Sequence, residues 1–310
     1  MTFDPHAPFR GIWPALLTPL NADLAIDHAR FSAHALALLG AGCGGVTPFG
    51  TTGEGPSFGV AERRDAVDAL VQHGVPASQI LVSTSCAALP ETLALTRHAL
   101  DIGAHGCLML PPFYLKGVPD QGVIDAYRYV IDGAADTRLR LYLYHIPQVV
   151  GVGLSHHVIH TLKQLYPQTI VGIKDSAGDL QHSLALADAF MPRLMVYVGN
   201  ELDLRELGRR GSSGAVSGLA NFIPRRVHRL VSQPDATGAA ADLERTRQVL
   251  ARANTHALIP ALKAIMAGVA HEPAWLRVRP PLVALTTSEM HTLMAGIAAL
   301  GVDPEINPPR

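Results

Sequence analysis

The chain has 310 residues, of which 48% are hydrophobic and only 16% are charged, and its formal net charge is −1. This composition excludes a disordered chain, and the lack of a basic block argues against a nucleic-acid-binding protein. Three cysteines without a CxxC pair, no leader-like N-terminus and no apolar stretch of about 18 residues predict a cytoplasmic protein without disulfides or a membrane span.

Short apolar runs alternate with helical patterns along the first 220 residues. The expected strands are Ile12–Thr18, Gly44–Pro48, Ile80–Thr84, Gly106–Leu110, Leu139–Tyr144, Ile170–Lys174, Leu194–Gly199 and Ser213–Ser217. The expected helices between them include Asp27–Leu39, Val60–Gln72, Leu89–Leu100, Ser155–Leu165 and Leu180–Phe190. Strand starts fall 19 to 36 residues apart, which is the length of one βα unit. Eight such units in a row predict a closed α/β barrel, the (β/α)₈ or TIM barrel.

A doubly wound open sheet is the main competing architecture. Its phosphate-binding turn would be rich in glycine after the first strand, whereas residues 17–21 contain none. After Pro224, where the eighth barrel helix is expected to begin, only helical patterns follow, at Ala239–Ala253, Thr255–Ala270 and Pro281–Leu300. We therefore expect a barrel over residues 1–233 and a C-terminal helical appendage over residues 234–310.

Reactive side chains in such a barrel lie at the carboxyl ends of the strands. Lys174 ends a β-branched strand, where loss of water would favour the neutral amine that attacks a carbonyl. The alternative is a buried ion pair of Lys174 with Asp175 or Glu201. Lys263 lies on a C-terminal helix, where we expect its amine to be solvated.

Two further strand ends carry candidate groups. Tyr144 ends the fifth expected strand, where its hydroxyl would relay protons or, alternatively, would only pack as an aromatic core residue. The glycine-rich turn over residues 50–55 follows the second expected strand. Its backbone N–H groups and the hydroxyls of Thr51 and Thr52 would bind a carboxylate, unless the turn only caps the next helix.

No metal site is expected. His156, His157 and His160 cluster at a helix start, but no carboxylate lies at ligand spacing, and HExxH and Walker A motifs are missing from the sequence.

In combination, these segments resemble the dihydrodipicolinate synthase / N-acetylneuraminate lyase family over essentially the whole chain. The segments that carry the resemblance are Ala15–Pro19, Gly50–Glu54, Leu110–Tyr114, Tyr144–Pro147, Gly172–Asp175 and Gly214–Gly218. The resemblance implies a class I aldolase or dehydratase that forms a Schiff base with pyruvate or another 2-keto acid. A covalent lysine imine would take the place of a cofactor.

The resemblance also implies roles for single residues. Lys174 would form the imine and Tyr144 would transfer protons, with Thr51 in the relay. Thr51 and Thr52 would hold the keto-acid carboxylate, and the backbone of Val216 would face the pyruvate portion. Tyr114 matches a tyrosine that family members lend to a neighbouring subunit, so a homo-oligomer, a tetramer by resemblance, is expected.

Departures from the family pattern concern the second substrate. Synthases carry an arginine two residues after the proline of the tyrosine motif, where this chain has Val149, and His145 replaces an asparagine. Sialic-acid lyases have an acidic pair after the glycine of the seventh strand, whereas Gly199 is followed by Asn200, Glu201 and Leu202.

Neutral side chains near the strand ends would bind hydroxyl groups. The candidates are Ser176, Ser217, Asn200 and His145, with Gly199 bordering the substrate; Ser176 could instead cap the next helix. The leading hypothesis is therefore a lyase for a 2-keto-3-deoxy sugar acid, with a small keto acid and possibly an aldehyde as ligands. The alternatives are 4-hydroxy-tetrahydrodipicolinate (dihydrodipicolinate) synthase and a non-catalytic keto-acid-binding protein on the same scaffold.

Overall fold

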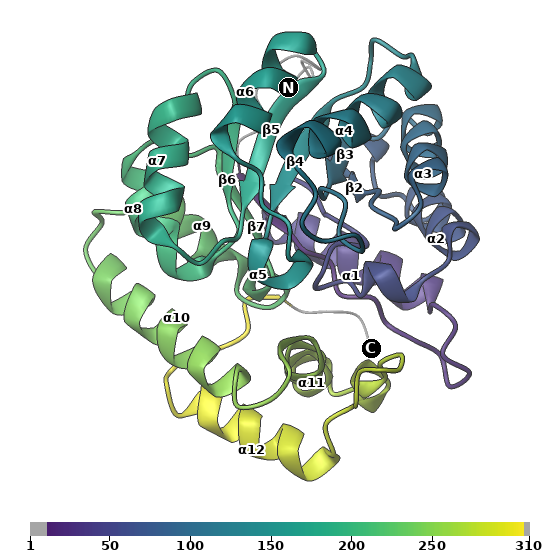
Figure 1. Cartoon of the computed structure of the whole chain (residues 1–310). Helices are drawn as coiled ribbons and strands as arrows, with labels where there is room; N and C mark the ends of the chain where they lie inside the picture. The colour runs from purple at the N-terminus through teal and green to yellow at the C-terminus, as the bar shows by residue number, and fades with distance from the viewer. Residues whose placement is uncertain (1–10, 307–310) are drawn as a thin grey trace.

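The centre of the molecule is a ring of parallel strands, seen in a computed structural model that describes residues 11–306 (Figure 1). Most of the N-terminal segment on which the leader prediction depends lies outside the described residues. The strands are β1 (Gly11–Pro14), β2 (Leu81–Ser83), β3 (Gly106–Met109), β4 (Leu141–His145), β5 (Ile170–Asp175), β6 (Met195–Val198) and β7 (Gly214–Ser217). Hydrogen bonds connect them in the order β1-β7-β6-β5-β4-β3-β2.

The expected strand at Gly44–Pro48 closes this ring without forming a regular strand. Its residues make only isolated parallel bridges, from Thr47 to Ala15 beside β1 and from Val46 to Ile80 beside β2. This segment lies close to β1, since a Cβ on Gly45 would lie 2.2 Å from the Trp13 ring. The barrel prediction is confirmed, but the described residues contain seven regular strands, not eight.

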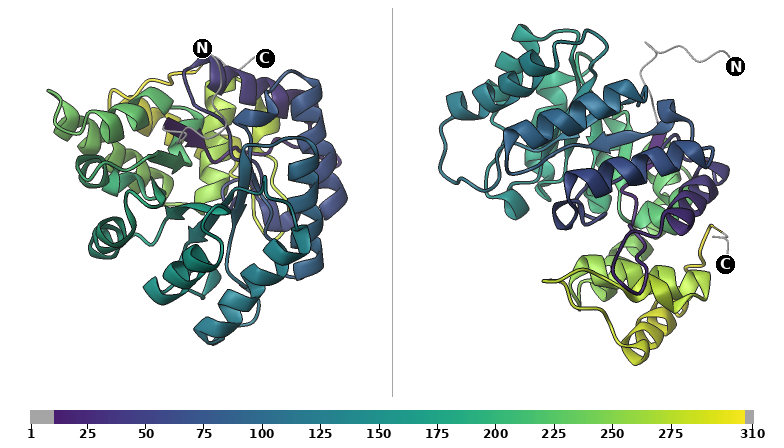
Figure 2. Two further views of the ribbon diagram at one scale, coloured as in Figure 1. Left: turned by 90° about the horizontal axis from the view of Figure 1, so that it is seen from above. Right: turned by 90° about the vertical axis from the view of Figure 1, so that its right-hand side faces the viewer.

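Helices cover the outside of the ring and continue beyond it (Figure 1). They are α1 (His28–Gly40), α2 (Val60–Gln72), α3 (Leu89–Asp101), α4 (Asp120–Ala134), α5 (Pro147–Val150), α6 (His156–Leu165), α7 (Leu180–Phe190), α8 (Leu204–Arg209), α9 (Pro224–Ser232), α10 (Ala239–Ala253), α11 (Leu258–Ala270) and α12 (Thr287–Ala298). The last three gather on one side of the barrel, which is clearest in the right-hand view of Figure 2.

Two C-terminal helices begin later than expected. α11 begins at Leu258 rather than Thr255, and α12 begins at Thr287 rather than Pro281. At α12 the cause is a capping box, in which the Thr286 side chain accepts from Glu289 N–H while the Glu289 carboxylate accepts from Thr286 N–H. Among the described residues, no helix is long and apolar enough to cross a membrane.

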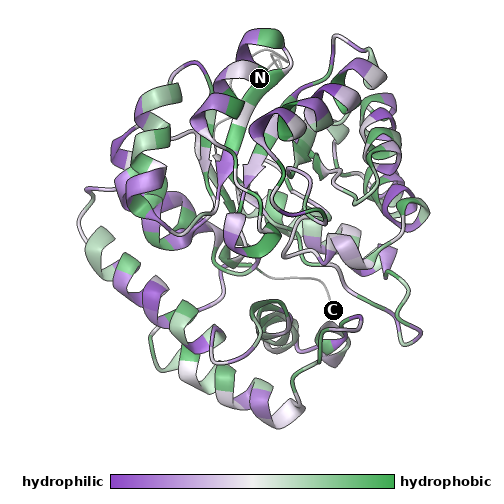
Figure 3. Cartoon of the chain, in the orientation of Figure 1, coloured by the Kyte–Doolittle hydropathy of each residue, from purple (hydrophilic) through white to green (hydrophobic). Residues whose placement is uncertain are grey.

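Successive side chains of each strand point to opposite faces, and this alternation separates two apolar clusters. One cluster fills the barrel interior and includes Trp13, Leu108 and Tyr142. The other lies between the strands and the surrounding helices and extends into α11, whose ribbon is mostly hydrophobic in Figure 3. Side chains at the strand ends are therefore held in place from both sides, and α11 packs as part of the core.

Candidate active site

A cavity of about 310 Å³ lies at the carboxyl ends of the barrel strands. Eight of the eleven site residues expected from the sequence line it: Thr51, Thr52, Tyr144, Lys174, Ser176, Gly199, Asn200 and Val216. The other three, Tyr114, Ser217 and His145, are not part of its lining. Most of the residues that were predicted from the strand ends thus surround one pocket, as expected for active sites of such barrels.

Lys174 and Tyr144 face each other on neighbouring strands. They are register partners in β5 and β4, and both point into the barrel. The Lys174 amine donates to the Tyr144 hydroxyl at 3.1 Å, and that hydroxyl lies 3.3 Å from Thr51 Oγ1. Lys174 is only 5% exposed and Tyr144 2%. This geometry forms a short hydroxyl chain that begins at a buried amine.

The alternative role of Lys174 in an ion pair is wrong. Among the described residues, no carboxylate lies within 4.0 Å of its amine. The Asp175 carboxylate instead accepts from the Ser183 hydroxyl at 2.6 Å. Glu201 accepts from the Ser217 hydroxyl at 2.7 Å.

The turn over residues 50–55 presents backbone donors at the pocket. Residues on both sides of Thr51 and Thr52 have left-handed backbone conformations, with φ of 60° at Phe49 and 57° at Glu54. The N–H groups of Thr51 and Thr52 have no acceptor among residues 11–306. Two adjacent free donors beside a buried amine are the arrangement that a carboxylate requires.

Ser176 and Gly199 lie next to the lysine. The Ser176 hydroxyl is buried and makes no hydrogen bond within the described part of the chain. It does not cap the following helix, because Asp179 accepts from the first N–H groups of α7. A Cβ on Gly199 would lie 1.8 Å from Ser176 Oγ and 2.9 Å from Lys174 Cε, so only glycine leaves room for both side chains.

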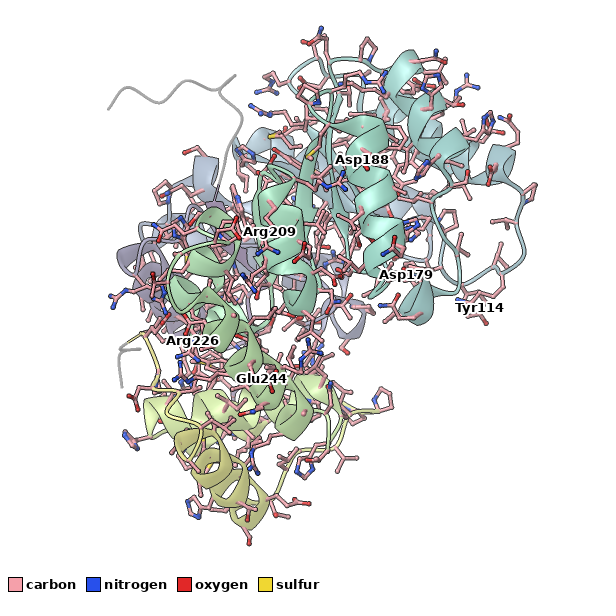
Figure 4. The ribbon with its side chains drawn as sticks, turned by 90° about the vertical axis from the view of Figure 1, so that its left-hand side faces the viewer. Tyr114, Asp179, Asp188, Arg209, Arg226 and Glu244 are labelled. Carbon is pink, nitrogen blue, oxygen red and sulfur yellow. The ribbon has the colours of Figure 1, made fainter. Side chains whose placement is uncertain are left out.

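Tyr114 lies on the loop between β3 and α4 and is not among the residues that line this pocket. Its side chain is at the edge of the molecule in Figure 4, and 78% of the residue is exposed. Within one chain, therefore, Tyr114 is exposed and does not line the cavity.

On the outer face of the same strands, His145 and Asp175 lie beside His182, with one ligand atom of each within 4.8 Å of the others. Protein hydrogen bonds occupy one nitrogen of His145 and one oxygen of Asp175, which accepts from the Ser183 hydroxyl. Nδ1 of His145 accepts from Leu154 N–H at 3.0 Å, so the neutral ring carries its proton on Nε2. The His145 and His182 rings are stacked, with their centroids 4.5 Å apart. Burial lowers the pKa of His145, which favours that neutral form.

Sequence reasoning missed the wall that the C-terminal helices contribute. Leu250 and Asn254 at the end of α10, and Leu258 and Leu262 on α11, line the same cavity. No motif marks these positions. Lys263 carried a signal that could have been used, because it is the only charged residue in the apolar run Leu258–Ala270.

The expectation of a solvated amine on Lys263 is wrong. Its side chain is fully buried and forms an ion pair of 2.6 Å with Glu54, the residue that follows the turn glycine Gly53. The apolar packing of α11 leaves Lys263 no path to solvent.

Comparisons with known proteins agree with this architecture. The model of the Dihydrodipicolinate synthetase family matches residues 8–300. A DapA-like lyase of Chloroflexus aurantiacus is 34% identical over 291 residues, covering 92% of this chain and 95% of the relative. The crystal structure of dihydrodipicolinate synthase from Agrobacterium tumefaciens has a TM-score of 0.88 at 31% identity, covering 94% of this chain and 99% of that one. YagE, an E. coli K12 prophage protein of the dihydrodipicolinic acid synthase family solved in complex with pyruvate, has a TM-score of 0.85 at 25% identity, with 94% and 99% covered.

Fold and relatives together define a barrel lyase. The chain belongs to the Dihydrodipicolinate synthetase family. The prediction of a Schiff-base-forming lyase of this family is confirmed at that level, whereas the substrate and the roles of single residues remain proposals.

Proposed function

We propose that this lyase forms an imine between Lys174 and a pyruvate-type 2-keto acid and then breaks a C–C or C–O bond next to it. The observation that carries the proposal is the buried Lys174 amine whose partner is the Tyr144 hydroxyl at 3.1 Å. A buried amine without a carboxylate partner is suited to attack a carbonyl.

The side chains divide the reaction among them. The Lys174 amine attacks the keto carbon, and Tyr144 delivers a proton to the resulting hydroxyl, which leaves as water. Thr51 then passes a new proton to the Tyr144 hydroxyl. In C–C cleavage the resulting iminium accepts the electron pair of the bond that breaks, while the hydroxyl on the departing carbon loses its proton. In C–O cleavage the iminium accepts the electron pair of the adjacent C–H bond, and the hydroxyl leaves with its own pair and a proton as water. The N–H groups of Thr51 and Thr52 hold the substrate carboxylate, and the backbone of Val216 and Gly199 borders the pyruvate portion.

The residues that line the pocket favour a substrate whose part beyond the keto-acid group carries no carboxylate. Among residues 11–306, Lys174 is the only cationic residue in the lining, and Val149, also in the lining, is 57% exposed. Glu201 adds a carboxylate that would repel another. Ser176 and Asn200 supply neutral hydrogen-bonding groups, so we favour a 2-keto-3-deoxy sugar acid over aspartate semialdehyde as substrate.

The first test is borohydride reduction in the presence of pyruvate, with the adduct located by mass spectrometry. The second test is a measurement of kcat/KM of the untreated enzyme for both substrate types, with and without EDTA. We expect one reduced adduct on Lys174, a preference for the sugar acid and no need for metal. An adduct on Lys174 without turnover of any keto acid would favour a non-catalytic keto-acid-binding protein. A preference for aspartate semialdehyde would favour dihydrodipicolinate synthase.

We also propose that the enzyme is a homo-oligomer in which Tyr114 completes a neighbour's site. Support comes from the resemblance and from the exposure of this tyrosine and the adjacent Leu115, which is 68% exposed. Mixing inactive Tyr114→Phe and Lys174→Ala chains should restore activity. No recovery after proven subunit exchange would contradict the sharing of Tyr114.

A further inference from the structure

The ion pair between Glu54 and Lys263 connects two parts of the chain that are 209 residues apart. The Lys263 amine lies 2.6 Å from Glu54 Oε1, and both side chains are 0% exposed. The second oxygen, Oε2, accepts from the backbone N–H of Arg279 at 3.2 Å. Both hydrogen-bond partners of this carboxylate among the described residues therefore come from the C-terminal region.

Both ends of the ion pair adjoin the pocket. Glu54 follows the turn that holds Thr51 and Thr52, and its own backbone has the left-handed φ of 57°. Lys263 follows Leu262, which lines the cavity. A Cβ on Gly218 would lie 3.2 Å from Leu262 Cδ1 and 3.5 Å from Thr52 Oγ1, so α11 and the turn border the same point.

Stability alone is a weak explanation for such a pair. Two charges lose their hydration on burial, and a well-packed apolar pair of similar volume often stabilises a fold equally well or better. The best-attested use of a buried ion pair is to fix one arrangement against alternatives. Here the arrangement is that of a turn with an unfavourable backbone conformation at Glu54, which a side-chain anchor can hold.

We propose that Glu54 and Lys263 are positioning residues for the keto-acid carboxylate. The ion pair anchors the turn to α11 so that the N–H groups of Thr51 and Thr52 face the Lys174 amine. This inference rests on the proposed function, since it assigns to the turn the substrate carboxylate. It makes the C-terminal helices part of the binding apparatus.

The experiment measures the pyruvate concentration that gives half-maximal borohydride labelling of Lys174, together with KM, kcat and the melting temperature. The first variant is Glu54→Gln/Lys263→Met, which leaves no unpaired charge and keeps an oxygen for Arg279 N–H. The second is Glu54→Asp, which keeps the charge pair but draws the turn toward α11. The control is Glu62→Gln, because Glu62 pairs with the Arg279 guanidinium without contacting the turn.

We expect both Glu54 variants to raise the half-maximal pyruvate concentration and KM by roughly 10- to 100-fold, the range for a misplaced binding group. Their kcat at saturation should fall much less, and Glu62→Gln should leave all three values unchanged. A lower melting temperature with unchanged KM in a folded Glu54 variant would overturn the inference and leave the pair a structural one. If wild type gives no adduct on Lys174, the proposed function fails, and the inference fails with it.

Discussion

Two buried lysines in this protein have opposite surroundings. Lys263 in α11 is fully buried and paired with the Glu54 carboxylate at 2.6 Å. Lys174 in β5 is almost as deeply buried, yet the group that its amine contacts is the Tyr144 hydroxyl. Burial therefore does not distinguish the two residues; the partner does.

The partner decides what a buried amine can do. Burial lowers the pKa of Lys263, but the Glu54 carboxylate opposes that shift and occupies the amine. An amine beside a neutral hydroxyl has no such counter-charge and remains available to a carbonyl carbon. The same comparison explains why one lysine lines a cavity while the other is sealed between a helix and a turn.

The largest effect that tests this comparison is expected for Lys174→Met. Turnover should fall by roughly 10⁴-fold or more, as it does when a covalent nucleophile is removed. Borohydride with pyruvate should no longer label the protein. Mass spectrometry of reduced peptides and steady-state kinetics measure both effects.

The matched comparison is Lys263 in the wild-type chain. Its peptide should carry no adduct, because Glu54 holds the amine and the site is closed to pyruvate. Labelling of Lys263, or persistent labelling of the Lys174→Met protein, would show that the partner does not determine reactivity here.

His34 sharpens the comparison, since it is another buried base whose partner is neutral. Its Nε2 lies 2.9 Å from the Asn221 side-chain oxygen, and burial lowers its pKa from 6.5 to about 4. Between these pH values the unfolded chain binds a proton that the folded chain does not. Stability is therefore complete above pH 6.5 and falls as the pH drops toward 4, by about 3 kcal/mol from this residue.

His34→Gln should reduce the number of protons that the chain takes up on unfolding in that pH range by about one. Glutamine does not titrate, but it can still donate to Asn221. Urea unfolding at several pH values measures the slope. The buried His105, whose pKa is lowered to about 3, should keep part of the acid sensitivity in the variant. An unchanged slope would mean that His34 is protonated in the fold.

Removal of the hydroxyl beside the reactive lysine should have a smaller effect than removal of the lysine itself. Tyr144→Phe should slow turnover by about 10²-fold, the range for one positioned acid–base group. Borohydride labelling at long incubation should survive, since Thr51 and Thr52 still bind the carboxylate. Single-turnover kinetics separate the two effects, and near-normal turnover would reduce Tyr144 to a packing residue.

The strand-end part of the site was predictable, because strand endings can be read from short apolar runs. Lys174 and Tyr144 each end such a run, and parallel neighbours bring their ends together. The α11 wall was not predictable in the same way. Leu258 and Leu262 belong to an ordinary apolar helix, and only the packing of that helix on the barrel brings them to the cavity.

The same limit explains the errors at Lys263 and at the second expected strand. A lysine in an apolar helix is compatible with either a solvated or a buried amine until its partner is known, and Glu54 is 209 residues away. The segment at Gly44–Pro48 has the apolar character of a strand. It pairs with the chain beside β1 and β2 through isolated bridges, and no local sequence pattern shows how regular such long-range pairing will be.

The smallest effect concerns a cation at the pocket rim rather than in its interior. Val149→Arg would place a guanidinium at a position that is 57% exposed and lines the cavity. A charged hydrogen bond contributes roughly 1.5–3 kcal/mol when buried, but exposure screens it, so we expect a gain of about 10-fold in kcat/KM for aspartate semialdehyde. The value for a 2-keto-3-deoxy sugar acid should change little, and Val149→Gln provides the uncharged control. High salt should reduce the gain of the arginine variant, because the interaction is electrostatic. An equal gain with Val149→Gln, or no gain with arginine, would mean that the missing charge does not set the preference, and Glu201 would then be the residue to neutralise next.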